Sequence, residues 1–425
     1  MKGMEAEMTY NVIGQRLPRS DAKQQVTGTS MYVDDFVRPG MLYGYVLRSE
    51  YAHANIKNID ISAAEKYPGV KAVITHKDMP YNRFGVHCDD QPVLADDKVR
   101  HYGDAIAAVA AVTLEIAEKA AKFINVDYEQ LQGIFDVFEA MNEDSPKVHG
   151  DSNLFRKIRI ANGDVGKGFN QSDFIVEDSI QTQRVEHAHI EPHVGFAEIA
   201  PNGDLVIHGS LARPFTIAAD LEKLLKIPMH RIQIITGAIG GAFGGKNEIT
   251  TEPLMAILAM KTKRPVKITF TREDEFISST IRHPYYCKYR SGVTKEGKII
   301  AREVEIIADT GAYVGWGVST LTKACVHCCG PYNIPNILVN GYLVYTNNPI
   351  SGAMRGFGVP QVGFAYEVHM DTIALRLGID PVELRLKNVL RDHDFLPCGQ
   401  EMPIVTSTET IEKALAIYNS IRGVK

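Results

Sequence analysis

Two glycine-rich segments contain the residue types in this sequence that could bind an anion or an oxygen-rich group. The first spans residues 240–247 (GGAFGGKN), and the second spans 352–358 (GAMRGFG). Glycines allow backbone N–H groups to approach a ligand closely. The fork of donors on Arg355 suits a phosphate or an oxyanion. Both segments therefore indicate ligand-binding loops, and each places one phenylalanine among its glycines.

The first segment nearly matches the nucleotide-binding pattern G-x-x-x-x-G-K-[ST]. It departs from the pattern at Asn247, which replaces the Ser or Thr that would hold Mg²⁺. Phe243 is also unusual inside a phosphate cradle. These departures disfavour a nucleoside triphosphatase, while a tight strand-to-helix turn without a ligand stays open as a structural alternative.

The six cysteines do not form a regular framework, so structural disulfides are not expected. Cys325, Cys328 and Cys329 could be half of a metal site, but no second cysteine pair stands nearby and His327 is poorly spaced for it. The alternative is a set of reduced thiols in or near a packed core.

Composition narrows the class of protein. The chain has 425 residues, a net charge of −5 and 45% hydrophobic residues, which suits two to three domains with large cores. The mild, mixed charge gives no support for nucleic-acid binding. There is no apolar run of about 18 residues and no signal-like stretch near Met1, so we expect a soluble, cytoplasmic protein without a membrane span.

Periodicity predicts an α+β protein in two parts. The first part, 1–140, alternates short strands with helices, including a strong helix at 113–124. A polar segment, 141–160, reads as a linker, and 161–425 forms a larger α/β region.

Five helices are predicted in the second part, the first of them at 219–226. One spans 251–262, directly after the first glycine-rich segment, and one spans 361–377 with Phe364, Val368 and Leu375 on one apolar face. The next begins with Asp380 as N-cap and Pro381 at the first helical position. The last places Ile411, Leu415 and Tyr418 on one face.

The two loops together resemble the molybdenum-cofactor loops of the xanthine dehydrogenase/aldehyde oxidase family, whose forms are GGxFGGK and RGFGxPQ. Other similar segments follow in the family's order along the chain: 19–22 (RSDA), 26–28 (VTG), 38–42 (RPGML), 52–54 (AHA), 187–193 (HAHIEPH), 282–284 (RHP) and 309–313 (DTGAY). The resemblance implies a hammerhead-type α/β domain followed by the family's first molybdopterin-binding domain.

The family hydroxylates aldehydes or electron-poor heteroaromatic carbons with oxygen from water. The resemblance therefore implies molybdopterin, expected as its cytosine dinucleotide, with molybdenum held through the pterin rather than by protein ligands. The implied cofactor-binding residues are Gly241, Ala242, Phe243, Gly244, Arg355 and Gly356. The implied substrate-binding residues are Asn247, Lys323 and Phe357.

Several positions depart from the family's best-known members. Asn247 and Lys323 replace the Glu and Arg of xanthine-specific enzymes, which puts purine specificity in doubt. Lys323 keeps a cation that could face a substrate carboxylate, although a solvated surface lysine is the alternative. Met354 replaces the cysteine of carbon monoxide dehydrogenases, and Ala212 aligns with a glutamine that commonly contacts the cofactor.

The family's second half, which carries the catalytic glutamate, has no counterpart here. Glu248 and Glu252 lie near the first loop, but a helix surface would explain them equally well. We therefore expect a divided enzyme in which a medium molybdopterin subunit supplies the base glutamate, with iron–sulfur clusters and FAD on further partner subunits.

Family members with a divided molybdenum subunit act on nicotinate, an anionic ring, and carry a terminal selenium ligand on molybdenum. The expected reaction is thus nicotinate to 6-hydroxynicotinate. The alternatives are hydroxylation of another N-heteroaromatic or an aldehyde, or a non-catalytic scaffold role.

Overall fold

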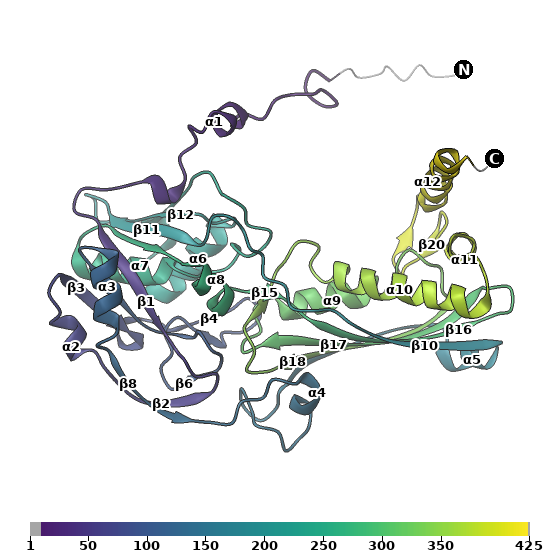
Figure 1. The fold of residues 1–425 in the computed structure, drawn as a ribbon, viewed down its shortest axis with the longest axis horizontal. Coiled ribbons are helices and arrows are strands. Elements are labelled where there is room, and N and C mark those ends of the chain that lie inside the picture. The colour runs from purple at the N-terminus through teal and green to yellow at the C-terminus, as the bar shows by residue number, and fades with distance from the viewer. Residues whose placement is uncertain (1–9, 424–425) are drawn as a thin grey trace.

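The fold has two lobes, each built on one β-sheet, in a computed structural model that describes residues 10–423 (Figure 1). The glycine-rich segments belong to different parts of this framework. The first follows an edge strand of one sheet, and the second precedes a long helix that covers the other.

The sheet of the first lobe has seven strands contributed by both predicted parts of the chain. In spatial order they are β13 (Ile232–Thr236), β12 (Leu205–Gly209), β11 (Val194–Ile199), β14 (Val266–Thr269), β1 (Leu42–Arg48), β7 (Ala105–Ala111) and β3 (Val70–Thr75). Strand β1 pairs in parallel with β14, with Leu42 opposite Val266. The N-terminal part therefore completes a sheet that the later part begins.

Helices cover both faces of this sheet. Along β7, Ala107, Val109 and Ala111 face a core that includes helix α3 (Leu114–Ala121), as the two-residue period of a strand requires. Ala108 and Ala110 face the opposite core, which contains α6 (Pro214–Leu225) and α7 (Glu252–Thr262). Helix α7 is buried around most of its circumference, which explains its nearly continuous apolar sequence.

The second lobe is built on a five-stranded sheet. Its order is β10 (Phe174–Gln181), β16 (Tyr285–Val293), β17 (Ile299–Gly311), β18 (Asn336–Tyr345) and β9 (Leu154–Asn162). Strand β9 begins inside the segment that the sequence predicts as a linker, so irregular backbone occupies only the earlier part of 141–160.

Helices α9 (Gly317–His327) and α10 (Val359–Leu377) pack on this sheet, and α11 (Pro381–Asn388) packs on α10. Cys325, Cys328 and Cys329 are free thiols buried in the resulting core, where burial raises the pKa of Cys325 to about 12. The interpretation as packed, reduced thiols fits this placement.

The smaller elements complete the described chain. They include the three-stranded sheet β6 (Lys98–Val99), β2 (Ala54–Asp60) and β8 (Asn125–Gln130), the pair β15 (Ile281–Arg282) and β19 (Ser351–Gly352), and helices α1 (Ala22–Val26), α2 (Ser62–Glu65), α4 (Val137–Ala140), α5 (Val165–Asn170) and α8 (Arg272–Ser278). No helix among residues 10–423 is long and apolar enough to cross a membrane.

The apolar face predicted for α10 is not the face that packs. Phe364 and Leu375 are 56% and 83% exposed, while Val362, His369 and Ile373 are buried. Apolar residues occur around most of this helix, so sequence periodicity did not select the packed side. The side of α10 that faces the sheet includes the buried His369. Its burial is possible because its Nε2 hydrogen-bonds Ser291 Oγ at 2.9 Å.

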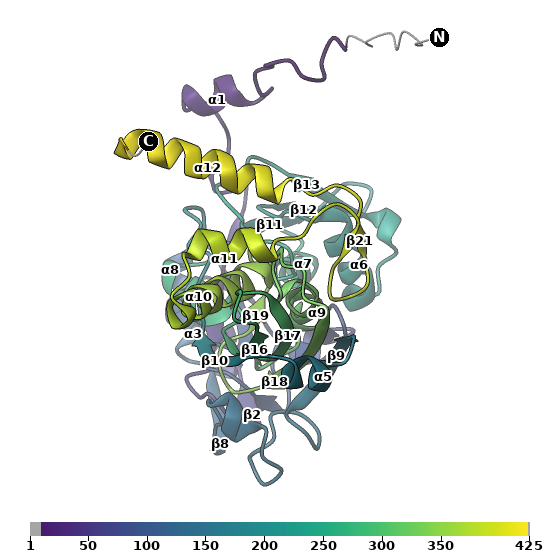
Figure 2. The same ribbon diagram turned by 90° about the vertical axis from the view of Figure 1, so that its right-hand side faces the viewer.

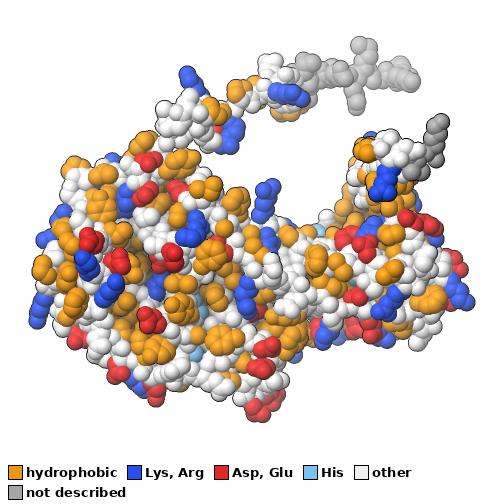
Figure 3. Space-filling view, in the orientation of Figure 1, with side chains coloured by type: hydrophobic (Ala, Val, Ile, Leu, Met, Phe, Trp, Pro, Cys, Tyr) orange, Lys and Arg blue, Asp and Glu red, His pale blue; other side chains and the backbone are white. Residues whose placement is uncertain are grey.

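Helix α11 begins where the sequence predicts. Asp380 caps α11 by accepting hydrogen bonds from the N–H groups of Val382 and Glu383, with Pro381 at the first position. Helix α12 (Ser407–Arg422) lies above α11, away from the five-stranded sheet, in both ribbon views (Figures 1 and 2). It buries none of its residues, and apolar side chains remain on its surface (Figure 3).

Candidate active site

The two glycine-rich loops line one cavity of about 350 Å³. Six of the residues predicted from the sequence take part in its wall. The lining residues are Arg213, Phe243, Gly244, Asn247, Trp316, Ala353, Met354, Arg355, Gly356 and Phe357. Segments more than 100 residues apart thus meet at one site.

Backbone contacts join the loops directly. The N–H of Arg355 donates to the carbonyl of Phe243 at 2.8 Å. Gly244 has a φ of +110°, and a Cβ at this position would lie 2.4 Å from the Ala353 carbonyl oxygen. The close approach therefore requires glycine here. Arg282 lies in β15, opposite Gly352 of β19. Its Nη2 donates a hydrogen bond to the Arg355 carbonyl oxygen at 2.9 Å.

Both phenylalanines occupy the left-handed backbone region, with φ of +50° at Phe243 and +54° at Phe357. Residues other than glycine seldom adopt this conformation, which costs about 1–2 kcal/mol. Such strain persists only where the surroundings hold it, and it concentrates at functional sites. Here it turns one aromatic ring from each loop toward the same cavity.

Two lining residues, Arg213 and Trp316, escaped the sequence analysis. The Arg213 guanidinium carbon lies 4.9 Å from the centre of the Trp316 ring, and that ring meets Phe357 edge-on at 5.8 Å and 70°. Arg213 is the N-cap residue of α6, directly before Pro214, and Trp316 is the N-cap residue of α9. The only signals in the sequence were the single tryptophan and an arginine before a helix-starting proline.

Three predicted residues lie outside the cavity wall. Gly241 packs against His189, and the Ala242 carbonyl accepts a hydrogen bond from Gly245 within the loop. Lys323 is exposed on α9. It follows Trp316 by seven residues, so it lies on the same side of the helix and about 10 Å farther along the helix axis. Gly241 and Ala242 thus shape the first loop, and Lys323 stands at a distance from it.

A buried ion pair supports the first loop from behind. Lys246 Nζ lies 2.9 Å from Glu191 Oε2 and 2.8 Å from Ser210 Oγ, and the N–H of Gly240 donates to the same carboxylate oxygen at 2.7 Å. Burial lowers the pKa of Lys246, although Glu191 opposes that effect. Because its ammonium group is buried and bonded to Glu191 and Ser210, Lys246 does not resemble a nucleotide-binding lysine.

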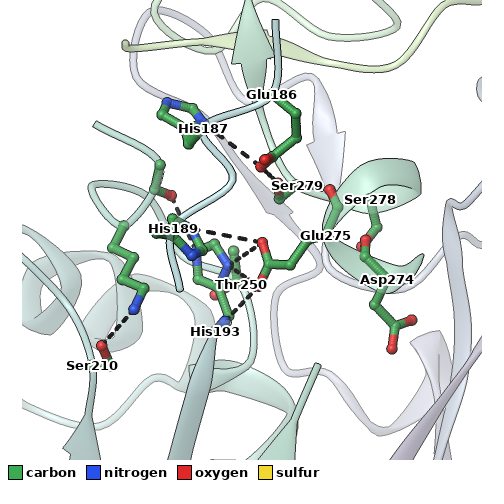
Figure 4. Close-up of polar contacts among 12 residues, drawn as sticks. Glu186, His187, His189, His193, Ser210, Thr250, Asp274, Glu275, Ser278 and Ser279 are labelled. Atoms are coloured by element: carbon green, nitrogen blue, oxygen red, sulfur yellow. Dashed lines mark hydrogen bonds and ion pairs between the residues drawn. The ribbon is translucent and has the colours of Figure 1, made fainter. Parts of the chain in front are cut away.

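A second buried pair, His193 and Glu275, also supports the first loop (Figure 4). His193 Nδ1 is 2.9 Å from Glu275 Oε2, and its Nε2 is 3.1 Å from the Gly245 carbonyl oxygen. Burial alone would raise the pKa of Glu275, but hydrogen bonds and charge from His193 outweigh it and hold the pKa at about 2. His189 also lies within 4.8 Å of this pair. Since both His193 nitrogens are already bonded, we interpret the cluster as a structural support.

The two glutamates after the first loop are not on a helix surface, which corrects that interpretation. Glu252 is buried at the start of α7, and burial raises its pKa. Burial, with the negative charges of Asp220 and Asp90, raises the pKa of Glu248 to about 8, against an opposing effect of Arg213. Glu248 Oε1 is buried and has no hydrogen-bond partner among residues 10–423.

Two family models match the chain. Residues 27–132 match the a/b hammerhead domain of aldehyde oxidase and xanthine dehydrogenase, and 148–389 match the molybdopterin cofactor-binding domain. The chain belongs to the xanthine dehydrogenase/aldehyde oxidase family. The predicted fold class, a hammerhead-type domain followed by a molybdopterin-binding domain, is confirmed.

Individual relatives agree with this assignment. The large molybdopterin subunit of nicotinate dehydrogenase from Eubacterium barkeri is 41% identical over 95% of this chain and 96% of its own length. The molybdenum-binding subunit of xanthine dehydrogenase from Escherichia coli O157:H7 is 33% identical over 94% of this chain. The solved aldehyde oxidoreductase of Desulfovibrio gigas is 33% identical over 95% of this chain, with a TM-score of 0.90. This chain spans about half of the latter two, 55% and 46%.

The cavity fits the oxygen-rich cofactor that the family implies. A Cβ at Gly244 would meet the Ala353 carbonyl oxygen, and a Cβ at Gly356 would meet the Pro360 ring. Both loops therefore present backbone without side chains at these positions. The Arg355 side chain is exposed and forms no hydrogen bond or ion pair with the described residues. Backbone and a free guanidinium together suit a pterin with oxo ligands.

Proposed function

We propose that this chain is the large molybdopterin subunit of a divided molybdenum hydroxylase that oxidises an electron-poor heteroaromatic carbon, with nicotinate to 6-hydroxynicotinate as its reaction. The observation that carries the proposal is the cavity formed jointly by Phe243, Arg355 and Phe357. The match to a nicotinate dehydrogenase subunit over nearly the whole of both chains supports this substrate.

The cofactor, when bound, supplies the redox chemistry that hydroxylates a carbon atom with oxygen from water. The chain's own residues position the reactants. Arg355 donates hydrogen bonds toward the cofactor's oxygens, and the Phe357 ring holds an aromatic substrate by edge or offset contact, itself fixed by Trp316. Asn247 offers a hydrogen bond beside that ring. Gly241 and Ala242 keep the first loop in shape, and we retain Lys323 as an outer contact for an anionic substrate.

Another chain supplies the general base in this proposal. No Asp or Glu is among the residues that line the cavity in the described structure. Glu248 lies nearby, but with a pKa of about 8 it holds its proton at pH 7 and cannot accept another. A carboxylate from a medium molybdopterin subunit would complete the site.

Exposed apolar side chains fit the presence of such a partner. Ile190 and Phe215 are 91% and 81% exposed, and both are within a few residues of groups that form the site. Phe364, Leu375 and the exposed residues of α12 extend this character to the second lobe. We place the partner's contacts at these residues, because exposed apolar side chains that gather in a patch mark interaction sites. Iron–sulfur and FAD subunits would then carry the electrons away, and the cofactor would be the cytosine dinucleotide with a terminal selenium ligand.

The test is to purify the complex natively, measure molybdenum and selenium per copy, identify the co-purifying chains and assay nicotinate oxidation. We expect about one molybdenum per copy, a medium-sized partner and 6-hydroxynicotinate as product.

G244A should abolish molybdenum retention, because the added Cβ would clash with the Ala353 carbonyl oxygen. Gly378→Ala is the matched control, since Gly378 also has a positive φ but nothing within 4 Å.

Two alternative outcomes have support from specific structures. Quinoline 2-oxidoreductase of Pseudomonas putida 86 is 26% identical over 96% of this chain, with a TM-score of 0.90, and the Desulfovibrio gigas enzyme is an aldehyde oxidoreductase. A panel with quinoline and aldehydes separates these substrates from nicotinate. An intact complex without molybdenum would replace the catalytic proposal with a scaffold role.

A further inference from the structure

Arg213 places a guanidinium in the cavity wall without an anionic partner. It lines the cavity beside Asn247 and Trp316. Its side chain forms no ion pair or hydrogen bond with the residues that the structure describes, 10–423, and only the Trp316 ring holds it, at 4.9 Å. Cation–π contact fixes a guanidinium in place while leaving its N–H donors available to another group.

The surrounding carboxyl groups do not neutralise this cation. Burial, together with Asp220 and Asp90, raises the pKa of Glu248 to about 8, so Glu248 is mostly uncharged at pH 7. Burial also raises the pKa of Asp220, an effect that Lys223 and Arg213 oppose. Neither carboxylate pairs with Arg213 at ion-pair distance. An unpaired, partly buried guanidinium is unfavourable by itself, which favours an anionic group at this position.

The aromatic neighbours define where that group would lie. Trp316 contacts both Arg213, at 4.9 Å, and Phe357, at 5.8 Å. Because Arg213, Trp316 and Phe357 line the same cavity, a flat ring held against Phe357 would lie in the cavity that also contains the guanidinium. The donors of arginine match the two oxygens of a carboxylate.

We propose that Arg213 binds the carboxylate of a ring substrate and so makes this site selective for anionic heteroaromatic acids. This inference rests on the proposed hydroxylase function and assigns its substrate selectivity to a residue that the sequence analysis missed. Arg213 is better placed than Lys323 for this role, because Lys323 is exposed and does not line the cavity. A phosphate of the cofactor is the other anion that the same guanidinium could bind.

The experiment compares R213Q with wild type in the intact complex, using nicotinate and its uncharged analogue nicotinamide. We expect kcat/KM for nicotinate to fall about 10- to 100-fold, the size of a lost charge-assisted hydrogen bond. Turnover of nicotinamide and molybdenum content should change little. Equilibrium dialysis with labelled nicotinate should show the same loss of affinity, independently of turnover.

Two further variants give this comparison its reference points. R231Q is the matched control, because Arg231 pairs with Asp204 on the surface, at 3.0 Å, away from the cavity. K323Q tests the competing cation and should change nicotinate affinity less than R213Q does.

Three results would overturn the inference. They are an equal loss for nicotinate and nicotinamide, a loss of molybdenum that assigns Arg213 to the cofactor, or a larger effect from K323Q. Failure of the hydroxylase proposal itself is recognised separately, because wild-type complex would then oxidise neither compound.

Discussion

The two sides of the first glycine-rich loop differ in how their polar groups are satisfied. On the buried side, Lys246 pairs with Glu191 and His193 pairs with Glu275. On the cavity side, Phe243 is 49% exposed and Arg355, from the neighbouring loop, has no partner among the described residues. One side is closed by the chain itself, and the other is left for a ligand.

This difference separates stability from binding. Removal of one partner of a buried charge pair is strongly destabilising, because it leaves the other charge uncompensated inside the protein. Exposed groups without contacts contribute little to folding. The loop backbone is therefore held in its strained shape by the buried side, so that the cavity side can be shaped for binding alone.

The largest effect is expected from breaking the buried pair. K246M should lower the free energy of unfolding by about 3–5 kcal/mol, because it leaves the Glu191 carboxylate without its cation. Denaturant unfolding of the purified complex measures this change. K57M is the control, since the Lys57–Glu129 pair is 52% exposed at both ends and should cost no more than about 1 kcal/mol. If K246M and K57M lowered the free energy of unfolding equally, the Lys246–Glu191 pair would not be a special support of the loop.

The second pair should make stability depend on acid. The pKa of Glu275 is held at about 2 in the folded protein, below its value of about 4.3 in an unfolded chain. Unfolded chains then bind more protons between these values, so its contribution, about 3 kcal/mol, is complete above about pH 4.3 and is lost as the pH falls toward 2.

Thermal unfolding across this pH range measures that contribution. Glu275→Gln should be less stable at neutral pH and should show a weaker decline on acidification. Glu118→Gln, at an exposed pair with Lys122, provides the comparison and should follow the wild-type profile. A wild-type slope in the Glu275 variant would contradict the assignment.

The smallest effect on folding is expected on the cavity side. R355M should unfold within about 0.5 kcal/mol of wild type, because no described residue contacts the guanidinium through a hydrogen bond or ion pair. Molybdenum per copy should nevertheless fall, as elemental analysis of the complex would show. A marked loss of stability with unchanged molybdenum would mean that Arg355 is structural.

Much of the fold was predictable because its signals are local. The Asp380-Pro381 start of α11 and the strand–loop–helix order around the first glycine-rich segment both depend on neighbouring residues alone. The packed face of α10 was not predictable, because apolar residues surround that helix and only its neighbours select Val362 over Phe364. The helix-surface interpretation of Glu248 and Glu252 was wrong because residues distant in the sequence bury the Glu248 Oε1 atom and the Glu252 side chain.

The sequence by itself determined the family, the two loops and most of the residues that line the cavity, because these features depend on contiguous motifs with fixed spacing. Only the tertiary structure decided that Lys246 faces inward to Glu191, that Lys323 stands apart, and that Arg213 and Trp316 join the site. Those three outcomes depend on residues distant in the chain, and side-chain direction is set by packing and charge pairing that no local pattern records.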